Sequence, residues 1–279
     1  MRYLFLKLLP KNLISRLVGV LTDLKIPTPF LLSIIQIYCM VYKVNLEEME
    51  AYPNQLRTFN DFFTRKLKPG ARPIDEEVGS IISPVDGTIS EFGAINKGFL
   101  TQTKGILYSL NDLIGKKDSK LFEDGFFITI YLSPADYHRI HSPINGVVKN
   151  FSYFSGNLWP VNNFGVKQIG GLFAINERIF TPLRYGKNNV AGVVKVGATI
   201  VGKISLDYNN LTTNSKKANQ IYLPIIPEKK YQKGDEIGKF MMGSTVILLF
   251  QKDQFISKEI NSGQKLKMGE AIGSLKESK

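Results

Sequence analysis

The only two histidines in the 279-residue sequence, His138 and His141, both lie in the segment of residues 131–143. Histidine is the side chain best suited to proton transfer near neutral pH. In a helix, the i, i+3 spacing would place both rings on one face, whereas an extended loop need not. A metal site would need further ligands, and no such cluster is recognisable with one cysteine and two histidines. The pair therefore indicates proton-transfer chemistry, with two merely packed or exposed rings as the alternative.

A possible nucleophile, Ser244, follows Gly243 within residues 238–250. A glycine before a serine at the entrance of a strand lets the backbone bend and leaves one carbonyl approachable. The serine hydroxyl can attack that carbonyl if a base takes its proton. The apolar, β-branched run that follows predicts a buried strand. The plainer interpretation is a tight turn into a core strand.

A carboxylate that could complete such a site is Asp86, in a Pro-Val-Asp-Gly turn. Aspartate commonly braces the backbone of turns of this kind, so a structural role is the simpler interpretation. Asp, His and Ser together are nevertheless the components of a proton-relay triad, which is defined by geometry rather than by chain order. Composition and spacing leave open whether the three residues meet.

The amino-terminal region predicts two helices separated by Pro27 and Pro29. Leucines at 13, 17, 21 and 24 form one helical stripe, and residues 30–42 carry no charge. These 13 residues would span ~20 Å as a helix, less than the ~30 Å of a bilayer core. We therefore expect no membrane crossing, and either interfacial helices or helices packed on the body of the protein.

The overall charge favours the membrane interface. The net charge is +12, which suits an anionic membrane surface. The basic residues are scattered and no nucleic-acid-binding signature accompanies them, so we expect no nucleic-acid partner. The single cysteine, Cys39, excludes an intramolecular disulfide and is consistent with a reducing compartment.

The remaining patterns predict an α+β fold. A third helix is expected from Asn45 through residues 46–51, and a short helix with Phe59, Phe62 and Phe63 on one face. Residues 69–73 indicate a boundary between an amino-terminal helical region (1–73) and a β-rich, largely antiparallel domain (74–279). Two short repeats occur in the β region: residues 83–89 resemble 142–148, and 233–238 resemble 268–273. Similar Lys-Gly-Asp turns occur in carrier domains, so a non-catalytic carrier or lipid-binding module is an alternative.

Ordered motifs along nearly the whole chain carry a family resemblance: residues 58–65, 84–87, 131–143, 156–162, 176–178, 196–202 and 243–245. With these motifs the chain resembles the bacterial phosphatidylserine decarboxylases, which depend on a pyruvoyl group. Met242 stands where that family usually has leucine, a substitution that conserves volume.

The resemblance implies a proenzyme that cuts itself between Gly243 and Ser244. His141, oriented by Asp86, would take the Ser244 proton, and Ser244 would become the covalent pyruvoyl cofactor that condenses with the amine of phosphatidylserine. His138 would contact the substrate carboxylate or transfer a proton during decarboxylation.

The resemblance also implies the location and partners of the protein. The processed chains, 1–243 and 244–279, would stay paired, with a homodimer of processed protomers as a further expectation. The protein would be peripheral on the cytoplasmic side of the cell membrane. A serine hydrolase that uses Asp86, His141 and Ser244 without self-cleavage is the other catalytic alternative, although Gly-Ser-Thr lacks the second glycine of a nucleophile elbow.

Overall fold

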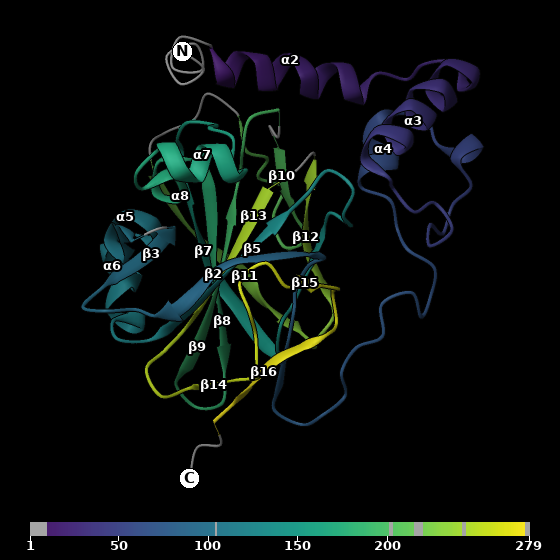
Figure 1. Cartoon of the computed structure of the whole chain (residues 1–279). Coiled ribbons are helices and arrows are strands. Elements are labelled where there is room, and N and C mark those ends of the chain that lie inside the picture. Colours follow the sequence, from purple (N-terminus) through teal and green to yellow (C-terminus); the bar gives the residue numbers. More distant parts are fainter. Residues whose placement is uncertain (1–9, 104, 201–202, 215–219, 242–243, 277–279) are drawn as a thin grey trace.

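The computed structural model describes residues 10–103, 105–200, 203–214, 220–241 and 244–276 (Figure 1). The expectations for residues 1–9, for 201–202 and for Met242 and Gly243 lie outside this part of the chain. Among the described residues, no helix is long and apolar enough to cross a membrane.

The amino-terminal helices are α2 (Lys11–Asp23) and α3 (Thr28–Tyr42), separated at the two prolines as predicted. After η1 (Pro53–Gln55), the phenylalanine motif forms α4 (Phe59–Phe63), also as predicted. The α4 helix begins with a capping box: Thr58 Oγ1 accepts from the Asp61 amide and Asp61 Oδ2 accepts from the Thr58 amide, both at 3.0 Å.

The prediction of a third helix over residues 45–51 is wrong. The Asn45 side chain accepts a hydrogen bond from the amide of Glu47, only two residues on, which makes a turn instead of a helix cap. The backbone of Glu48 and Glu50 then pairs with Lys66 and Lys68. The Met49 amide donates to the Leu46 carbonyl at 3.1 Å, so the segment is a turn followed by a bridge to Leu67.

The β region is built on an eight-stranded sheet. Its order is β11 (Gln220–Tyr231), β7 (Gly146–Phe154), β8 (Arg178–Tyr185), β9 (Asn189–Val196), β13 (Ser244–Phe250), β5 (Phe126–Leu132), β2 (Gly87–Ala94) and β15 (Lys265–Leu266). Smaller sheets are β10 (Lys203–Leu206)–β12 (Glu236–Met241)–β6 (Arg139–His141), β1 (Ser80–Ile82)–β16 (Ala271–Leu275)–β14 (Phe255–Ser257), and β3 (Phe99–Thr103)–β4 (Ile106–Ser109). The pairings within these sheets are antiparallel, so the α+β prediction is confirmed.

Short helices inside the β region were not predicted: α5 (Leu110–Ile114), α6 (Lys116–Ser119), η2 (Lys120–Phe122), α7 (Asn163–Gln168) and α8 (Leu172–Ile175). Each is too short to show a helical repeat of apolar residues. Apolar side chains of α5, α7 and α8 pack in a cluster with Ile247 and Leu249 of the central sheet, so these helices cover one of its faces.

The strand β13 is the centre of the structure, as its apolar sequence predicts. Every residue from Ser244 to Phe250 is buried. Alternate side chains belong to different clusters: Val246 and Leu248 lie in the core toward the small sheets, and Ile247 and Leu249 lie toward the helices. A third cluster, separate from both, joins α3 and α4.

An ionisable side chain is buried within the central sheet. Lys195 on β9 is fully buried, and its Nζ donates to Thr181 Oγ1 at 2.7 Å. Burial lowers the pKa of Lys195 to about 7.

The two repeats found in the sequence have the same local structure and pair with each other. Ser83 Oγ donates to the Val85 carbonyl and Ser142 Oγ to the Ile144 carbonyl, both at 2.7 Å. Ser83 exchanges backbone hydrogen bonds with residues 269 and 270, and Ser142 does so with residues 234 and 235. Each Ser-Pro turn is thus held by one copy of the Gly-Asp or Gly-Glu turn.

Candidate active site

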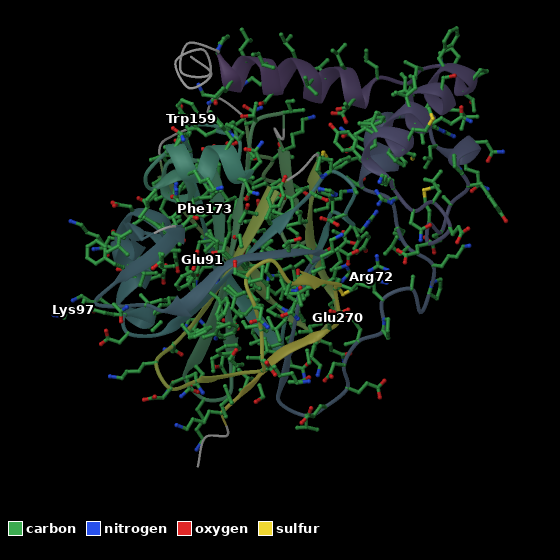
Figure 2. All side chains as sticks on the ribbon, viewed as in Figure 1. Arg72, Glu91, Lys97, Trp159, Phe173 and Glu270 are labelled. Carbon is green, nitrogen blue, oxygen red and sulfur yellow. The ribbon has the colours of Figure 1, made fainter. Side chains whose placement is uncertain are left out.

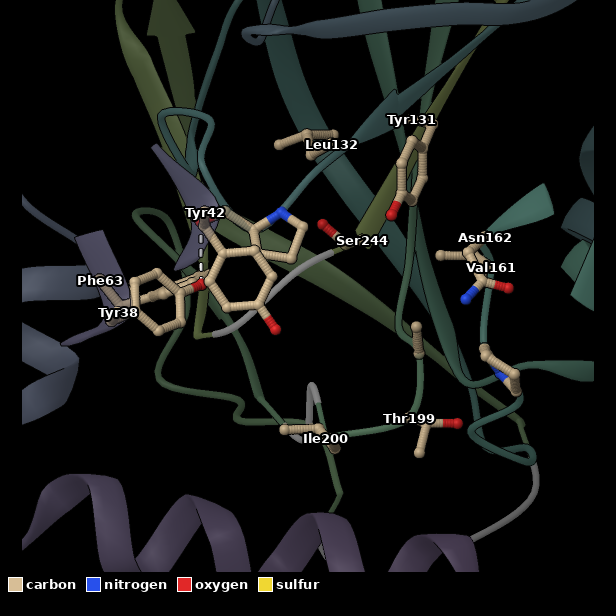
Figure 3. Close-up of a pocket in the computed structure, with 13 residues that line it drawn as sticks. Tyr38, Tyr42, Phe63, Tyr131, Leu132, Val161, Asn162, Thr199, Ile200 and Ser244 are labelled. Atoms are coloured by element: carbon tan, nitrogen blue, oxygen red, sulfur yellow. Dashed lines mark hydrogen bonds between the residues drawn. The ribbon is translucent and has the colours of Figure 1, made fainter. Parts of the chain in front are cut away.

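Ser244 is the first residue of β13, and its side chain lies at the wall of a cavity of about 190 Å³, which we call the Ser244 cavity (Figure 3). Aromatic side chains of three segments line it, including Tyr38 from α3, Phe63 from α4 and Tyr131 from β5. The Ser244 Oγ is fully buried and has no hydrogen-bond partner among the described residues. A buried hydroxyl without a partner carries a desolvation penalty of about 1–3 kcal/mol. Thr245 Oγ1 is also buried without a partner in the described chain, so it is the position at the cavity that distinguishes Ser244.

His138 lies close behind one wall of the Ser244 cavity. Its ring packs on Phe63 with the ring centroids 4.1 Å apart. Its Nδ1 lies 2.7 Å from the Asp136 carbonyl, an acceptor, so this nitrogen carries the hydrogen and Nε2 holds a lone pair. The Nε2 atom is buried, and the described part of the chain offers it no partner.

The protonation of His138 is controlled by burial and by Arg65. Burial, followed by the charge of Arg65, lowers the pKa of His138 to about 3, so the ring is neutral at pH 7. The Arg65 Nη2 donates to the Ala135 carbonyl at 3.0 Å and approaches the Asp136 carbonyl at 3.4 Å. Arg65 and His138 therefore share the Asp136 carbonyl, which explains their electrostatic coupling.

Both ring nitrogens of His141 have hydrogen-bond partners, and these differ from the partner of His138. Its Nδ1 donates to the Gly234 carbonyl at 2.6 Å, and its Nε2 lies 3.1 Å from the Tyr137 hydroxyl, which donates to it. Burial lowers the pKa of His141, so this ring is also neutral and its Nε2 is a base. The backbone of His141 donates to the Pro84 carbonyl at 2.8 Å, which places the Asp86 turn beside it.

The Asp86 carboxylate accepts a backbone hydrogen bond that braces a turn, and it also forms an ion pair. Its Oδ1 accepts from the Met268 amide at 2.8 Å, as Oδ1 of Asn145 in the repeated turn accepts from the Lys233 amide at 2.7 Å. An uncharged amide is thus sufficient for the brace. The Asp86 charge is paired with Arg72, whose Nε lies at 2.8 Å and Nη2 at 2.5 Å from the carboxylate. Figure 2 labels Arg72 beside the β region.

The structure places the turn that contains Asp86 next to the backbone of His141, but the described residues show no hydrogen bond between the two side chains. The two histidines are separated along β12. His141 pairs with Glu236, whereas the Phe240 amide donates to the His138 carbonyl at 2.9 Å. Strand β12 ends at Met241, just before Ser244, so His138 lies nearer than His141 to the Ser244 end of this strand.

Several residues of the site were not predicted from the sequence. Tyr137 lies in the histidine motif itself, and its position directly before His138 was the available signal. Arg72 lies in the segment interpreted as a domain boundary, and Arg65 ends the phenylalanine motif. Within the described chain, no group of three or more Asp, Glu, His or Cys side chains could hold a metal ion.

The comparisons with known proteins agree with the motifs. The phosphatidylserine decarboxylase family matches residues 59–274. The chain is 41% identical over 271 residues to the phosphatidylserine decarboxylase proenzyme of Brevibacillus brevis, covering 96% of this chain and 95% of that protein. It is 41% identical to the proenzyme of Myxococcus xanthus, with 88% of each chain covered, and 40% identical to that of an Anaeromyxobacter species, with 96% of each covered. The chain therefore belongs to the phosphatidylserine decarboxylase family.

Proposed function

We propose that this protein decarboxylates phosphatidylserine to phosphatidylethanolamine and carbon dioxide, after cutting its own chain between Gly243 and Ser244. The observation that carries the proposal is the buried Ser244 Oγ at the wall of the cavity, without a partner among the described residues, in a chain of this family. The described part of the chain offers this hydroxyl no acceptor, so it is available to attack the carbonyl of its own preceding peptide bond once a base takes its proton.

The proposed self-cleavage is an acyl shift followed by an elimination. A base takes the Oγ proton, Oγ bonds to the Gly243 carbonyl carbon, and the peptide C–N bond breaks as the Ser244 nitrogen receives a proton. Loss of the α-proton of residue 244 then expels the Gly243 carboxylate and leaves dehydroalanine. Water converts this residue to a pyruvoyl group and ammonia, so no external oxidant or reductant is needed.

We propose His141 as the base of self-cleavage and Asp86 as its electrostatic partner. The neutral Nε2 of His141 accepts a hydrogen bond from the Tyr137 hydroxyl. This bond must break, and one from the Ser244 hydroxyl must form, before Nε2 can take the Ser244 proton. The Asp86 carboxylate, beside His141, would stabilise the imidazolium that forms. This assignment predicts a rearrangement of the Tyr137–His141 pair before cleavage.

We propose that His138 acts in decarboxylation. Its buried Nε2 lone pair accepts a hydrogen bond or a proton, and the low pKa makes the ring a proton donor only after it has taken a proton during turnover. Phe63 holds the ring against the cavity wall, so its position is fixed by packing.

The surroundings of residue 244 fit a pyruvoyl group. Such a group supplies an electrophilic ketone that condenses with the substrate amine and takes up the electrons released with carbon dioxide. Tyr131 and Asn162 line the same cavity and present a hydroxyl and an amide near residue 244 (Figure 3). These two side chains can orient a polar headgroup, while Tyr38 and Phe63 exclude water.

We further propose that the protein docks peripherally on an anionic membrane surface. Ten large apolar residues of α2, α3 and the loop between them are 45–72% exposed: Leu13, Leu17, Val20, Leu21, Leu24, Phe30, Ile34, Ile37, Met40 and Val41. Together with the net charge of +12, this apolar surface suits the interface of an anionic bilayer. Tyr38 and Tyr42 of α3 line the Ser244 cavity, so the docked helix would lie beside the site.

Intact mass under denaturing conditions tests the proposal. We expect a chain of residues 1–243 and a chain of residues 244–279 (279 − 243 = 36 residues) that resists Edman sequencing because its first residue is a pyruvoyl group. Ser244→Ala should stay intact, and Ser257→Ala, which changes an exposed serine, should cleave normally.

Two results would favour other functions. An uncleaved chain that hydrolyses esters would identify a serine hydrolase. An uncleaved chain without activity would favour a carrier or lipid-binding module.

A further inference from the structure

Helix α2 lies across the β region (Figure 1), and its polar side chains face the body of the protein. Ser15 is fully buried against the body, Asn12 Nδ2 donates to the Gly156 carbonyl at 3.1 Å, and Lys11 Nζ lies 3.7 Å from the Trp159 ring centroid. The leucines at 13, 17 and 21 are instead exposed. This orientation reverses that of an ordinary surface helix, so polar contacts connect α2 to the body.

The contacts of α2 are made with the rim of the Ser244 cavity. Ser15 Oγ accepts a hydrogen bond from the Ile200 amide at 2.9 Å. Ile200 and Thr199 line the cavity, and α2 runs directly beneath them in Figure 3. Thr199 Oγ1 donates to the Leu158 carbonyl at 2.5 Å, which ties this rim to the loop that Asn12 and Lys11 contact.

The rim residue held by Ser15 has an unfavourable backbone conformation. Ile200 has φ +72°, in the left-handed region that a β-branched side chain rarely adopts. Such a conformation costs about 1–3 kcal/mol and persists only where the surroundings enforce it. The Ser15 hydroxyl is the side-chain partner of the Ile200 amide, so it stabilises this conformation directly.

A second contact runs from Arg16 into the core. Arg16 Nε donates to the backbone carbonyl and to Oδ1 of Asn214, at 3.2 and 3.1 Å. The Asn214 amide donates to Glu177 Oε1 at 2.6 Å, and the Tyr153 hydroxyl donates to the same oxygen at 2.6 Å. Arg16 therefore fixes the orientation of α2 relative to a buried network of the β region.

We propose that Ser15 is a positioning residue for the decarboxylase site: it makes α2 a support of the cavity rim and holds Ile200 in the conformation that admits the lipid headgroup, while Arg16 fixes the orientation of α2 on the β region. The inference rests on the proposed function, because it concerns the same cavity. It gives α2 two roles on opposite sides. The apolar side faces the bilayer, and the polar side shapes the entrance through which phosphatidylserine reaches residue 244.

The test compares Ser15→Ala with Ser33→Ala in the full-length processed protein. Ser33 is a matched control, because its Oγ donates to the Pro29 carbonyl of its own helix and has no bond to the β region among the described residues. The substrate is short-chain phosphatidylserine kept below its micelle concentration, so membrane binding does not contribute. We expect kcat/KM for carbon dioxide release to fall about three- to tenfold in Ser15→Ala, mainly because KM rises. This fold-change corresponds to the loss of one hydrogen bond. Self-cleavage and vesicle binding should be unchanged.

Ile200→Gly provides the specific check, because glycine adopts a positive φ without strain. In the Ile200→Gly background, adding Ser15→Ala should change kcat/KM by less than about twofold, since the strain that Ser15 offsets is gone. Independently of activity, hydrogen exchange of the Ile200 amide should be about three- to tenfold faster in Ser15→Ala than in Ser33→Ala.

Three results would overturn the inference. The first is an unchanged kcat/KM in Ser15→Ala with the soluble substrate, and the second is an equal loss in both backgrounds. The third is a loss seen only with vesicles and matched by weaker vesicle binding, which would make α2 an anchor alone. If the wild-type protein released no carbon dioxide, the proposed function would fail, and hydrogen exchange would still decide whether Ser15 supports the rim.

Discussion

The charge of Asp86 can be separated from its bracing role by the substitution Asp86→Asn. The repeated turn shows that an asparagine makes the same brace, because Asn145 accepts a backbone amide as Asp86 does. Asp86→Asn should therefore keep the turn while it removes the charge beside His141. The reciprocal variant Asn145→Asp adds a charge to the other turn and is the matched control.

The expected loss of stability is moderate. Asp86 and Arg72 form a buried ion pair, with side-chain exposures of 9% and 7%. Breaking such a pair costs about 3–5 kcal/mol when one charge is left alone. Arg72 keeps Glu48 at 2.8 Å, and Asn keeps the acceptor for the Met268 amide, so we expect about 1–3 kcal/mol. This corresponds to a Tm lower by roughly 2–10 °C.

The expected loss of self-cleavage is much larger. If Asp86 stabilises the protonated His141, the cleavage rate should fall by about 10²- to 10⁴-fold in both Asp86→Asn and Asp86→Ala. The assay is a time course of chain cleavage on denaturing gels, beside thermal unfolding of the same samples. Asn145→Asp should cleave at the wild-type rate. Wild-type cleavage by Asp86→Asn, together with failure of Asp86→Ala, would show that Asp86 only braces the turn.

Three further predictions concern the histidines, the core and the membrane. His141→Ala should stay uncleaved, whereas His138→Ala should cleave but release carbon dioxide about 10²-fold more slowly; the reverse pattern on a gel would exchange the two roles. Because burial lowers the pKa of Lys195 to about 7 from 10.5, wild-type stability should rise with pH across that interval. Lys195→Met should flatten this rise in unfolding measurements, and parallel curves would refute it. Leu17→Gln with Leu21→Gln should weaken sedimentation with anionic vesicles at least about tenfold, and residual binding should fall with salt; undiminished binding would place the contact elsewhere.

Local sequence patterns were sufficient for several elements. The run after Ser244 is β-branched and apolar, and it forms the central strand because such a segment is stable only when both faces are covered. Pro27 and Pro29 mark the start of the second helix, since Pro27 is its N-cap and Pro29 lies in its first turn, where no amide hydrogen is needed. The spacing of the phenylalanines predicted α4, and Thr58 and Asp61 supply its cap within the same few residues.

The sequence by itself also identified the two repeats and the family motifs, from Asp86 to the histidines and Ser244. These are properties of short stretches. The role of each residue as a base, a brace or a nucleophile depends on its partners, and the partners come from distant segments.

Tertiary structure alone decided the rest. The stripe of α2 shows that one side is apolar, but only the polar atoms of the body, such as the Ile200 amide, determine that the apolar side faces outward. Residues 45–51 form a turn and a bridge instead of a helix because the backbone of residues 66 and 68 pairs with them. Arg72 forms an ion pair with Asp86, and the Tyr137 hydroxyl hydrogen-bonds to Nε2 of His141. The spacing of these residues in the sequence does not predict either contact. Periodicity is a local property of the chain, whereas hydrogen-bond partners and burial depend on which segments the fold brings together.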